Sequence, residues 1–337
     1  MSSGFEFQEK FVTQLKSIIA SNIGLADELA MVLNLSTDSV YRRLRCQSAF
    51  SLDEVAIISK KFGVSVDGML NLDELQVNFH FNPMFEEPTN FQKYLKWFAD
   101  YLIELSQIQG LRVIYAAEDV PLFRHFNFPN LSAFKSYYWT KAVLHSDFFK
   151  AKKYTRDIVS DEILAINKQA YVAYSQINSV EIWTEETLTS SLKQVEFFWE
   201  SDLFENKDQA ILVINDIRYM LDELRTDCEN SYKNHPSKRG QFTLFNSEVM
   251  IGNNCVLIEA SDSNFKEQVF LGHNTFNNLS THNAAFARET RLWMDNLSKK
   301  SLQLSGTAEK QRARFFKKMY EKVDALIKNI AGEATSN

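Results

Sequence analysis

The chain has 337 residues, of which 45% are hydrophobic and 13% are aromatic, and its formal net charge at pH 7 is −6. This length favours two or three domains with a sizeable core, and the scarcity of glycine (10 residues) and proline (5 residues) favours helices over a turn-rich all-β fold. The acidic balance argues against a general nucleic-acid coat, although a local basic patch could still bind DNA.

The first 72 residues contain four helical patterns. They cover residues 8–20, 25–34, 37–45 and a stretch that follows Ser51. Asn34 can adopt the left-handed conformation that ends a helix, and Ser36 is suited to cap the helix that follows. Ser51 can cap the fourth helix, and Gly63 then ends it. Two short helices separated by a tight turn at 34–36 are typical of a helix-turn-helix.

Downstream of this region, helical spacing alternates with β-prone runs. We predict helices over residues 91–108, 131–145, 161–177 and 207–230, a helix capped by Thr184 that reaches about Phe198, and strands at 111–116 and 180–183. From Gln241, four β-prone runs at residues 242–245, 248–251, 255–260 and 267–272 indicate an antiparallel meander, with a hairpin turn at 251–254. Helices are expected again from about residue 281, and a final one runs from Thr307 to Ile330.

These patterns define a fold class and a domain organisation. We expect an α+β, mostly helical chain, with an N-terminal helix-turn-helix bundle and a larger mixed domain that contains an antiparallel sheet. The predicted boundaries are 1–72 for the DNA-binding domain, 73–90 for a linker centred on Asn82–Thr89, and 91–331 for an effector or dimerisation domain.

The helix that begins at Thr37 carries the clearest chemical signal. Val40 and Leu44 must face the core, so the opposite face presents Asp38, Arg42 and Arg45. In a helix-turn-helix the second helix enters the major groove, where an arginine can bind guanine through two hydrogen bonds. The predicted DNA-binding residues are Thr37, Asp38, Ser39, Tyr41, Arg42, Arg43, Arg45 and Gln47. Tyr41, Arg43 and Gln47 are the ones we assign to phosphates.

Residues 8–70 resemble the lambda-repressor-like (XRE-type) helix-turn-helix family. The matching segments are 29–35 as second helix and turn, 36–45 as recognition helix, and 51–70 as the following helix with its FGVSVDGML ending. The resemblance implies that Thr37, Asp38, Ser39 and Arg42 face bases. Asn34 stands where many members have glycine, and Cys46–Phe50 lacks the Gly and Pro that are common after the recognition helix.

One alternative is a plain helical bundle whose arginines form a solvated face. The first 75 residues hold more acidic than basic side chains, so any DNA-binding face must concentrate its positive charge locally. The turn, the two caps and the outward arginines agree with one another, which favours DNA binding over the bundle.

Two features of the larger domain could bind ligands. Ser305, Lys310, Arg312 and Arg314 lie where the last helix starts and could bind an anion, although an ordinary capped helix with a solvated basic face explains them as well. Aromatic residues around 79–98 and 137–139 could line an apolar pocket, and core packing is the commoner explanation.

We expect no enzymatic activity, no cofactor and no metal. There is no phosphate loop, GxSxG elbow or dinucleotide fingerprint, and no Ser–Lys pair is marked for self-cleavage. Three distant cysteines and six scattered histidines have no ligand spacing. No apolar run reaches the ~18 residues of a membrane span, and the N-terminus lacks a signal-peptide pattern.

The sequence therefore predicts a cytoplasmic, sequence-specific transcriptional regulator. Double-stranded DNA is the expected partner, bound by a homodimer, and the larger domain would oligomerise or sense an unidentified small-molecule or protein effector. The alternative function is a protein-interaction module whose helix-turn-helix is a scaffold and does not bind DNA.

Overall fold

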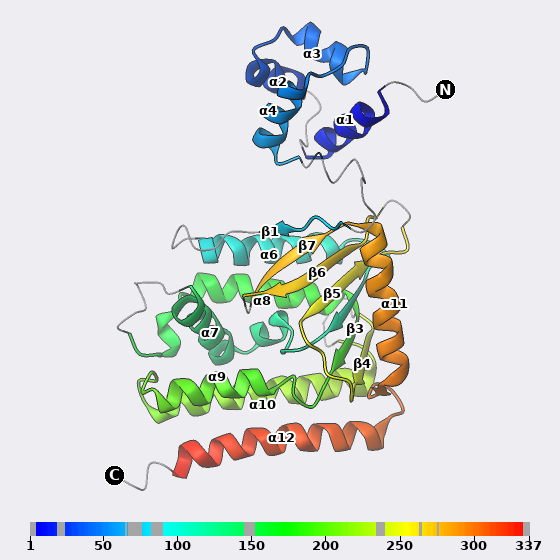
Figure 1. The fold of residues 1–337 in the computed structure, drawn as a ribbon. Helices are drawn as coiled ribbons and strands as arrows, with labels where there is room; N and C mark the ends of the chain where they lie inside the picture. The colour runs from blue at the N-terminus through cyan, green and yellow to red at the C-terminus, as the bar shows by residue number, and fades with distance from the viewer. Residues whose placement is uncertain are drawn as a thin grey trace. The chain divides into compact units, whose positions relative to one another are not determined.

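The computed structural model describes residues 5–18, 24–64, 66, 76–81, 90–144, 152–233, 240–262, 265–274 and 276–332. The chain divides into two compact units, Met1–Asn78 and Phe79–Asn337, and both are drawn in Figure 1. The predicted linker core Asn82–Thr89 lies outside the described residues, as does most of the GVSVDGML segment. Within the described ranges, no helix combines the length and the apolar character needed to cross a membrane.

The described part of the first unit, residues 5–18, 24–64, 66 and 76–78, contains four packed helices. Its helices are α1 (Glu6–Ile18), α2 (Leu25–Leu33), α3 (Thr37–Leu44) and α4 (Leu52–Phe62). Their apolar faces meet in one small core centred on Phe11, Leu29, Val40 and Ile58, none of which is exposed to solvent. The predicted helices are confirmed to within a few residues at each end.

The second unit combines helices with a single eight-stranded sheet, which confirms the predicted α+β class. Its helices are α6 (Asn90–Ser106), η1 (Leu122–Asn127), α7 (Pro129–Tyr138), η2 (Trp139–Val143), η4 (Arg156–Ile158), α8 (Asp161–Gln176), α9 (Thr189–Glu200), α10 (Lys207–Asn230), α11 (Ala284–Lys300) and α12 (Glu309–Gly332). Its strands are β1 (His80–Phe81), β2 (Arg112–Ala116), β3 (Asn178–Trp183), β4 (Phe242–Asn246), β5 (Cys255–Glu259), β6 (Gln268–His273), β7 (Asn277–Thr281) and β8 (Leu302–Gln303).

The sheet is mixed, with strand order β1-β7-β6-β5-β2-β3-β4-β8. Strands β2, β3 and β4 are parallel and central, whereas β5, β6 and β7 form an antiparallel meander on one side. The predicted meander is therefore wrong in its first member, because β4 pairs with β3 and not with β5. Residues 248–251 form no strand, and 251–254 is a connection between distant strands, not a hairpin turn.

Helices cover both faces of this sheet (Figure 1). Helix α11 packs on one face, where Ala287 and Met294 meet Ile114 and Leu257. The other face carries the main core, to which α6, α7, α8, α9 and α10 contribute, and α12 packs along α10. Burial on both faces explains why β2 has the sequence of an apolar run, with four consecutive buried residues from Val113 to Ala116.

Three local predictions differ from the structure. Thr184 does not cap a helix, because its hydroxyl accepts a hydrogen bond from the Glu186 backbone N–H in a turn, and α9 begins only at Thr189. The last helix begins at Glu309, two residues after the predicted start. Within the predicted linker 73–90, His80 and Phe81 form the edge strand β1 and pair with Ser280 and Leu279.

Candidate nucleic-acid interface and a buried ion cluster

The turn between α2 and α3 is fixed by backbone and side-chain caps. Asn34 adopts the left-handed conformation (φ 54°, ψ 45°), and its N–H donates to the Ala30 carbonyl. The Ser36 hydroxyl accepts a hydrogen bond from the Ser39 N–H at 3.3 Å, which starts α3. Both predicted caps are confirmed. Together they fix the angle between α2 and α3.

Helix α3 presents a polar face opposite its buried Val40. Asp38, Arg42, Arg45 and the following Gln47 are exposed, as is Tyr41. Arg42 pairs with Asp38 at 3.2 Å, and the Arg45 guanidinium lies 5.7 Å from the centre of the Tyr41 ring. Such exposed contacts are worth only a few tenths of a kcal/mol, so both arginines can exchange them for other partners at little cost.

The remaining predicted residues are more strongly held. Thr37 and Ser39 are half-buried, and the Ser36 hydroxyl donates to that of Ser39 at 2.9 Å. Arg43 donates two hydrogen bonds of 3.0 Å to the carboxylate of Glu54, and a third goes to the Ser39 carbonyl. Arg43 therefore joins α3 to α4. Its guanidinium is occupied by these hydrogen bonds, whereas those of Arg42 and Arg45 make only weak, exposed contacts.

Glu54 serves this pair and the cap of α4 at once. Its carboxylate accepts the Ser51 N–H at 2.8 Å, while the Ser51 hydroxyl accepts the Glu54 N–H, which is a complete capping box. Burial alone would raise the pKa of the Glu54 carboxyl, but the hydrogen bonds from Arg43 and Ser51 outweigh it and lower that pKa below its ordinary value.

Gln8 is a structural residue that the sequence analysis missed. Its amide nitrogen donates to the carbonyls of Arg43 and Ser48 at 2.7 and 2.8 Å, and its amide oxygen accepts the Phe50 N–H at 3.0 Å. One buried side chain on α1 thus satisfies three backbone groups at the end of α3 and in the loop after it. A polar residue on the apolar face of the first helical pattern was the available signal.

The loop after α3 adopts the shape for which glycine is the usual residue. Cys46 has a positive φ of 55°, and the Gln47 N–H donates to the Arg42 carbonyl at 2.8 Å. The loop thus closes without Gly or Pro, because these backbone bonds and the contacts of Gln8 hold a left-handed cysteine in place.

The structure does not bring the four candidate anion-binding residues together. The Ser305 hydroxyl is buried and accepts the Leu244 N–H, and Arg312 donates to the carbonyls of Leu304 and Gly306. Lys310 and Arg314 are exposed, and α12 begins with the acidic Glu309. Ser305 instead binds the turn before α12 to β4, and Arg312 binds the carbonyl groups of that turn. No cluster of metal-ligating side chains occurs in the part of the chain that the structure describes.

Comparison with known protein families agrees with this geometry. Residues 9–87 match the BetR domain, a helix-turn-helix-type family of DNA-binding domains, and the match indicates a DNA-binding regulatory role. No curated protein and no solved structure was found to match the chain.

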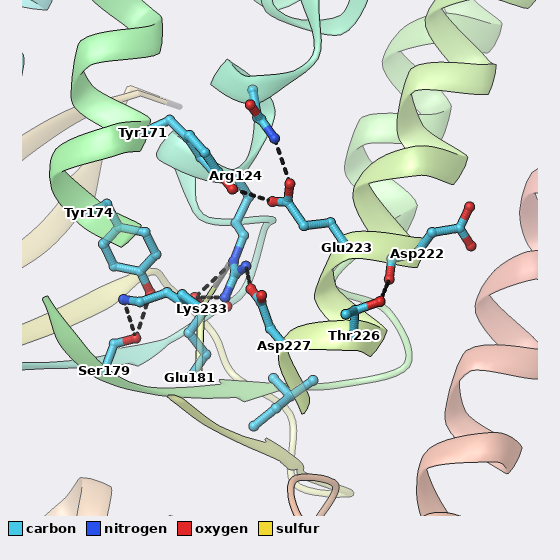
Figure 2. Close-up of polar contacts among 12 residues, drawn as sticks. Arg124, Tyr171, Tyr174, Ser179, Glu181, Asp222, Glu223, Thr226, Asp227 and Lys233 are labelled. Atoms are coloured by element: carbon cyan, nitrogen blue, oxygen red, sulfur yellow. Dashed lines mark hydrogen bonds and ion pairs between the residues drawn. The ribbon is translucent and has the colours of Figure 1, made fainter. Parts of the chain in front are cut away.

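The second unit contains a buried ion cluster at the centre of its core (Figure 2). Arg124 on η1 donates two hydrogen bonds to Glu181 on β3, at 3.0 and 2.8 Å, and one to Asp227 on α10, at 2.8 Å. All three side chains are at most 2% exposed. The Arg124 guanidinium also lies over the Phe242 ring of β4, 4.6 Å from its centre.

A buried lysine, Lys233, and the hydroxyls of Ser179 and Tyr174 lie beside this group. Lys233 donates to Ser179 at 2.9 Å and lies 3.6 Å from the centre of the Tyr174 ring, while the Tyr174 hydroxyl donates to Glu181. Burial and the nearby Arg124 charge lower the pKa of Lys233 well below its usual value. Trp183 donates to the second oxygen of Glu181 at 2.9 Å, so neither carboxylate oxygen is left without a partner.

We expect Cys46→Gly to stabilise the first unit by about 0.5–1 kcal/mol, because glycine adopts the left-handed conformation without strain. Hydrogen–deuterium exchange of peptides from α3 and α4, measured in the full chain, reports this local stability. The matched control is Cys46→Ala, which removes the thiol but keeps a β-carbon on the left-handed backbone, and so keeps the strain. Equal protection in the two variants would show that the backbone conformation is not the cause.

Glu54→Gln should lower the stability of the first unit by about 2 kcal/mol at neutral pH, since it removes a charged partner from Arg43. The folded-state pKa of Glu54 is depressed, so the contribution is present above its unfolded pKa and is lost as pH falls through the folded value. The two proteins should therefore converge in acid, at pH values below the depressed folded-state pKa of Glu54. The control is Arg42→Ala, whose exposed ion pair should matter by less than about 0.5 kcal/mol. A difference that persists unchanged in acid would contradict this role of Glu54.

Arg124→Met should destabilise the second unit by about 3–5 kcal/mol, because Glu181 and Asp227 would remain buried without their cation. Denaturant unfolding of the full chain, followed by tryptophan fluorescence, measures the loss. Arg225→Met on α10 is the comparison, since Arg225 forms an exposed pair with Glu229. If the two variants lost similar amounts, the cluster would not be the dominant polar contribution to this core.

Proposed function

We propose that this chain is a sequence-specific transcriptional regulator that binds DNA through α3, in the manner of lambda-repressor-like proteins. The observation that carries the proposal is the left-handed turn at Asn34 and the Ser36 cap, which hold α3 with Arg42 and Arg45 exposed. The BetR-domain match over residues 9–87 supports it independently.

In this proposal the residues of α3 divide into three roles. Thr37, Asp38, Ser39 and Arg42 occupy the N-terminal part and the outer face of the helix, which reach base edges in this mode of docking. Tyr41, Arg45 and Gln47 contact phosphates. Arg43 instead positions the helix through Glu54, which changes the phosphate role that the sequence suggested for it.

We also propose that the protein acts as a homodimer on a two-fold site, because a single small module seldom supplies enough affinity. The second unit would then provide dimerisation and sense an effector, and the proposal includes no enzymatic step. The alternative function is a protein-interaction module with a scaffold helix-turn-helix, and the surplus of acidic side chains in residues 1–75 is the observation that favours it.

The test begins with selection of genomic fragments by the purified full-length protein, followed by binding measurements over a range of salt. We expect a two-fold-symmetric motif and an affinity that falls steeply with salt. Arg42→Ala should cost about 1–3 kcal/mol on the selected site and relax the choice of base. Arg45→Ala should weaken all sequences alike and reduce the salt slope by about 1.

Lys10→Ala is the matched control, since Lys10 is an exposed basic residue on α1 that pairs with Glu6. This variant should bind as the unmodified protein does. Selection of no sequence over random DNA at any salt would favour the interaction module, and identical effects of the Arg42 and Arg45 variants would overturn the division of roles.

A further inference from the structure

A cavity of about 80 Å³ lies inside the second unit, between α6 and the face of the sheet. Aromatic rings from several elements form its walls, among them Trp97 and Tyr101 of α6, Tyr115 of β2 and Phe270 of β6. Phe98 and Trp139, from the two aromatic clusters of the sequence, also line it, whereas Tyr137 packs in the core against Tyr154 and Phe198. A larger hollow of about 600 Å³ on α6 is bordered by exposed charged side chains such as Lys96 and Asp100, which pair with each other.

The cavity has one strongly polar end, at Asp119. Its carboxylate accepts the Val120 N–H at 2.8 Å and the Ser190 hydroxyl at 3.1 Å, and its backbone N–H donates to Asn254 at 3.0 Å. No basic side chain among the described residues forms an ion pair with it. This carboxylate is the one formally charged group in the lining of the cavity.

The neighbouring bases do not neutralise Asp119 directly. Lys135 is buried and donates to Ser191 and Gln194, each at 2.8 Å. His125 also lines the cavity. Burial and the Lys135 charge lower the pKa of its imidazole well below the usual value, so the imidazole is neutral. Ser191 is only 2% exposed and does not line the cavity, but its hydroxyl donates to the Asp119 carboxylate at 3.4 Å. Lys135 therefore acts on Asp119 only through the intervening Ser191, and the carboxylate has no directly paired cation among the described residues.

Aromatic walls and a single carboxylate select for a particular ligand chemistry. A cation is attracted by the faces of Trp and Tyr rings, most strongly where water is excluded. The carboxylate can accept further hydrogen bonds from an N–H donor, and a charged partner strengthens them. An anionic ligand would be repelled, and a pure hydrocarbon would leave Asp119 desolvated without compensation. The size of the cavity limits the buried part to a few non-hydrogen atoms.

We propose that this cavity binds a small organic amine, with its ammonium group on Asp119 and its hydrocarbon body between the rings of Trp97, Tyr101 and Phe270. The site lies entirely within the second unit and is independent of the proposed DNA binding. It gives the second unit a defined ligand class, which neither the fold nor the family match assigns.

The first experiment compares three probes of similar shape: isobutylamine, isobutanol and isobutyrate. Their binding to the full-length protein is measured by saturation-transfer NMR. We expect isobutylamine to bind at least about tenfold more tightly than isobutanol, which corresponds to one charge-assisted hydrogen bond, and isobutyrate not to bind. Equal binding of all three, or no saturable binding of isobutylamine up to ~20 mM, would overturn the proposal.

Two pairs of variants then locate the site. Asp119→Asn should weaken isobutylamine by about tenfold and leave isobutanol within about twofold, whereas Asp295→Asn, an exposed change on α11, should alter neither. Trp97→Ala should weaken isobutylamine by about fivefold, while Trp293→Ala on α11 should not. Trp97 and Trp293 are 44% and 42% exposed, so replacing either should disturb the fold to a similar, small extent. The Trp97 variant therefore still tests the site if the Asp119 variant does not fold. Isobutylamine binding that is unchanged in both Asp119→Asn and Trp97→Ala would place the amine elsewhere and exclude this cavity.

Discussion

The second unit depends on a cation that has been removed from water. Arg124 can stay charged in the core only because Glu181 and Asp227 accept its hydrogen bonds, and those carboxylates in turn need Arg124. The three residues come from η1, β3 and α10, so their geometry is satisfied only when a connection, a central strand and a long helix meet in one arrangement. A purely apolar core would tolerate small shifts between these elements. A three-way ion contact tolerates smaller shifts, so it restricts how η1, β3 and α10 can pack together.

The first unit uses the same principle on a smaller scale. A partly buried ion pair, Arg43 with Glu54, and a buried amide, Gln8, fix α3 against its neighbours, while Arg42 and Arg45 make only weak, exposed contacts. Rigid support beneath an exposed and adaptable face is consistent with the proposed role of α3 in DNA binding. Neighbouring arginines of one short helix therefore have different tasks, which their positions relative to α4 decide.

The parts of the fold that depend on neighbouring residues could be predicted from the sequence. The caps at Asn34, Ser36, Ser51 and Gly63 and the helix 207–230 follow from local chemistry. The pairing of β4 with β3 could not be predicted, because it joins segments about 60 residues apart and a parallel partner leaves no turn signal. The same limit applies to the site. The exposed face of α3 follows from Val40 and Leu44, but Arg43 pairs with Glu54 of α4, and the backbone partners of Gln8 lie more than 30 residues away in sequence. The backbone partners of Ser305 and Arg312, in β4 and in the turn before α12, could not be predicted from the sequence either.

The pairing of β1 with β7 has a consequence for synthesis on the ribosome. His80 is made early, yet its strand partner Ser280 emerges 200 residues later, which at ~5–20 residues per second is about 10–40 s of elongation. The described core of the helical first unit lies between Phe11 and Val64, so this part of the chain can fold during that interval. The sheet of the second unit, in contrast, cannot acquire its β1 edge until almost the entire polypeptide has been translated. A nascent chain would therefore carry a folded helix-turn-helix well before the sheet of the second unit is complete.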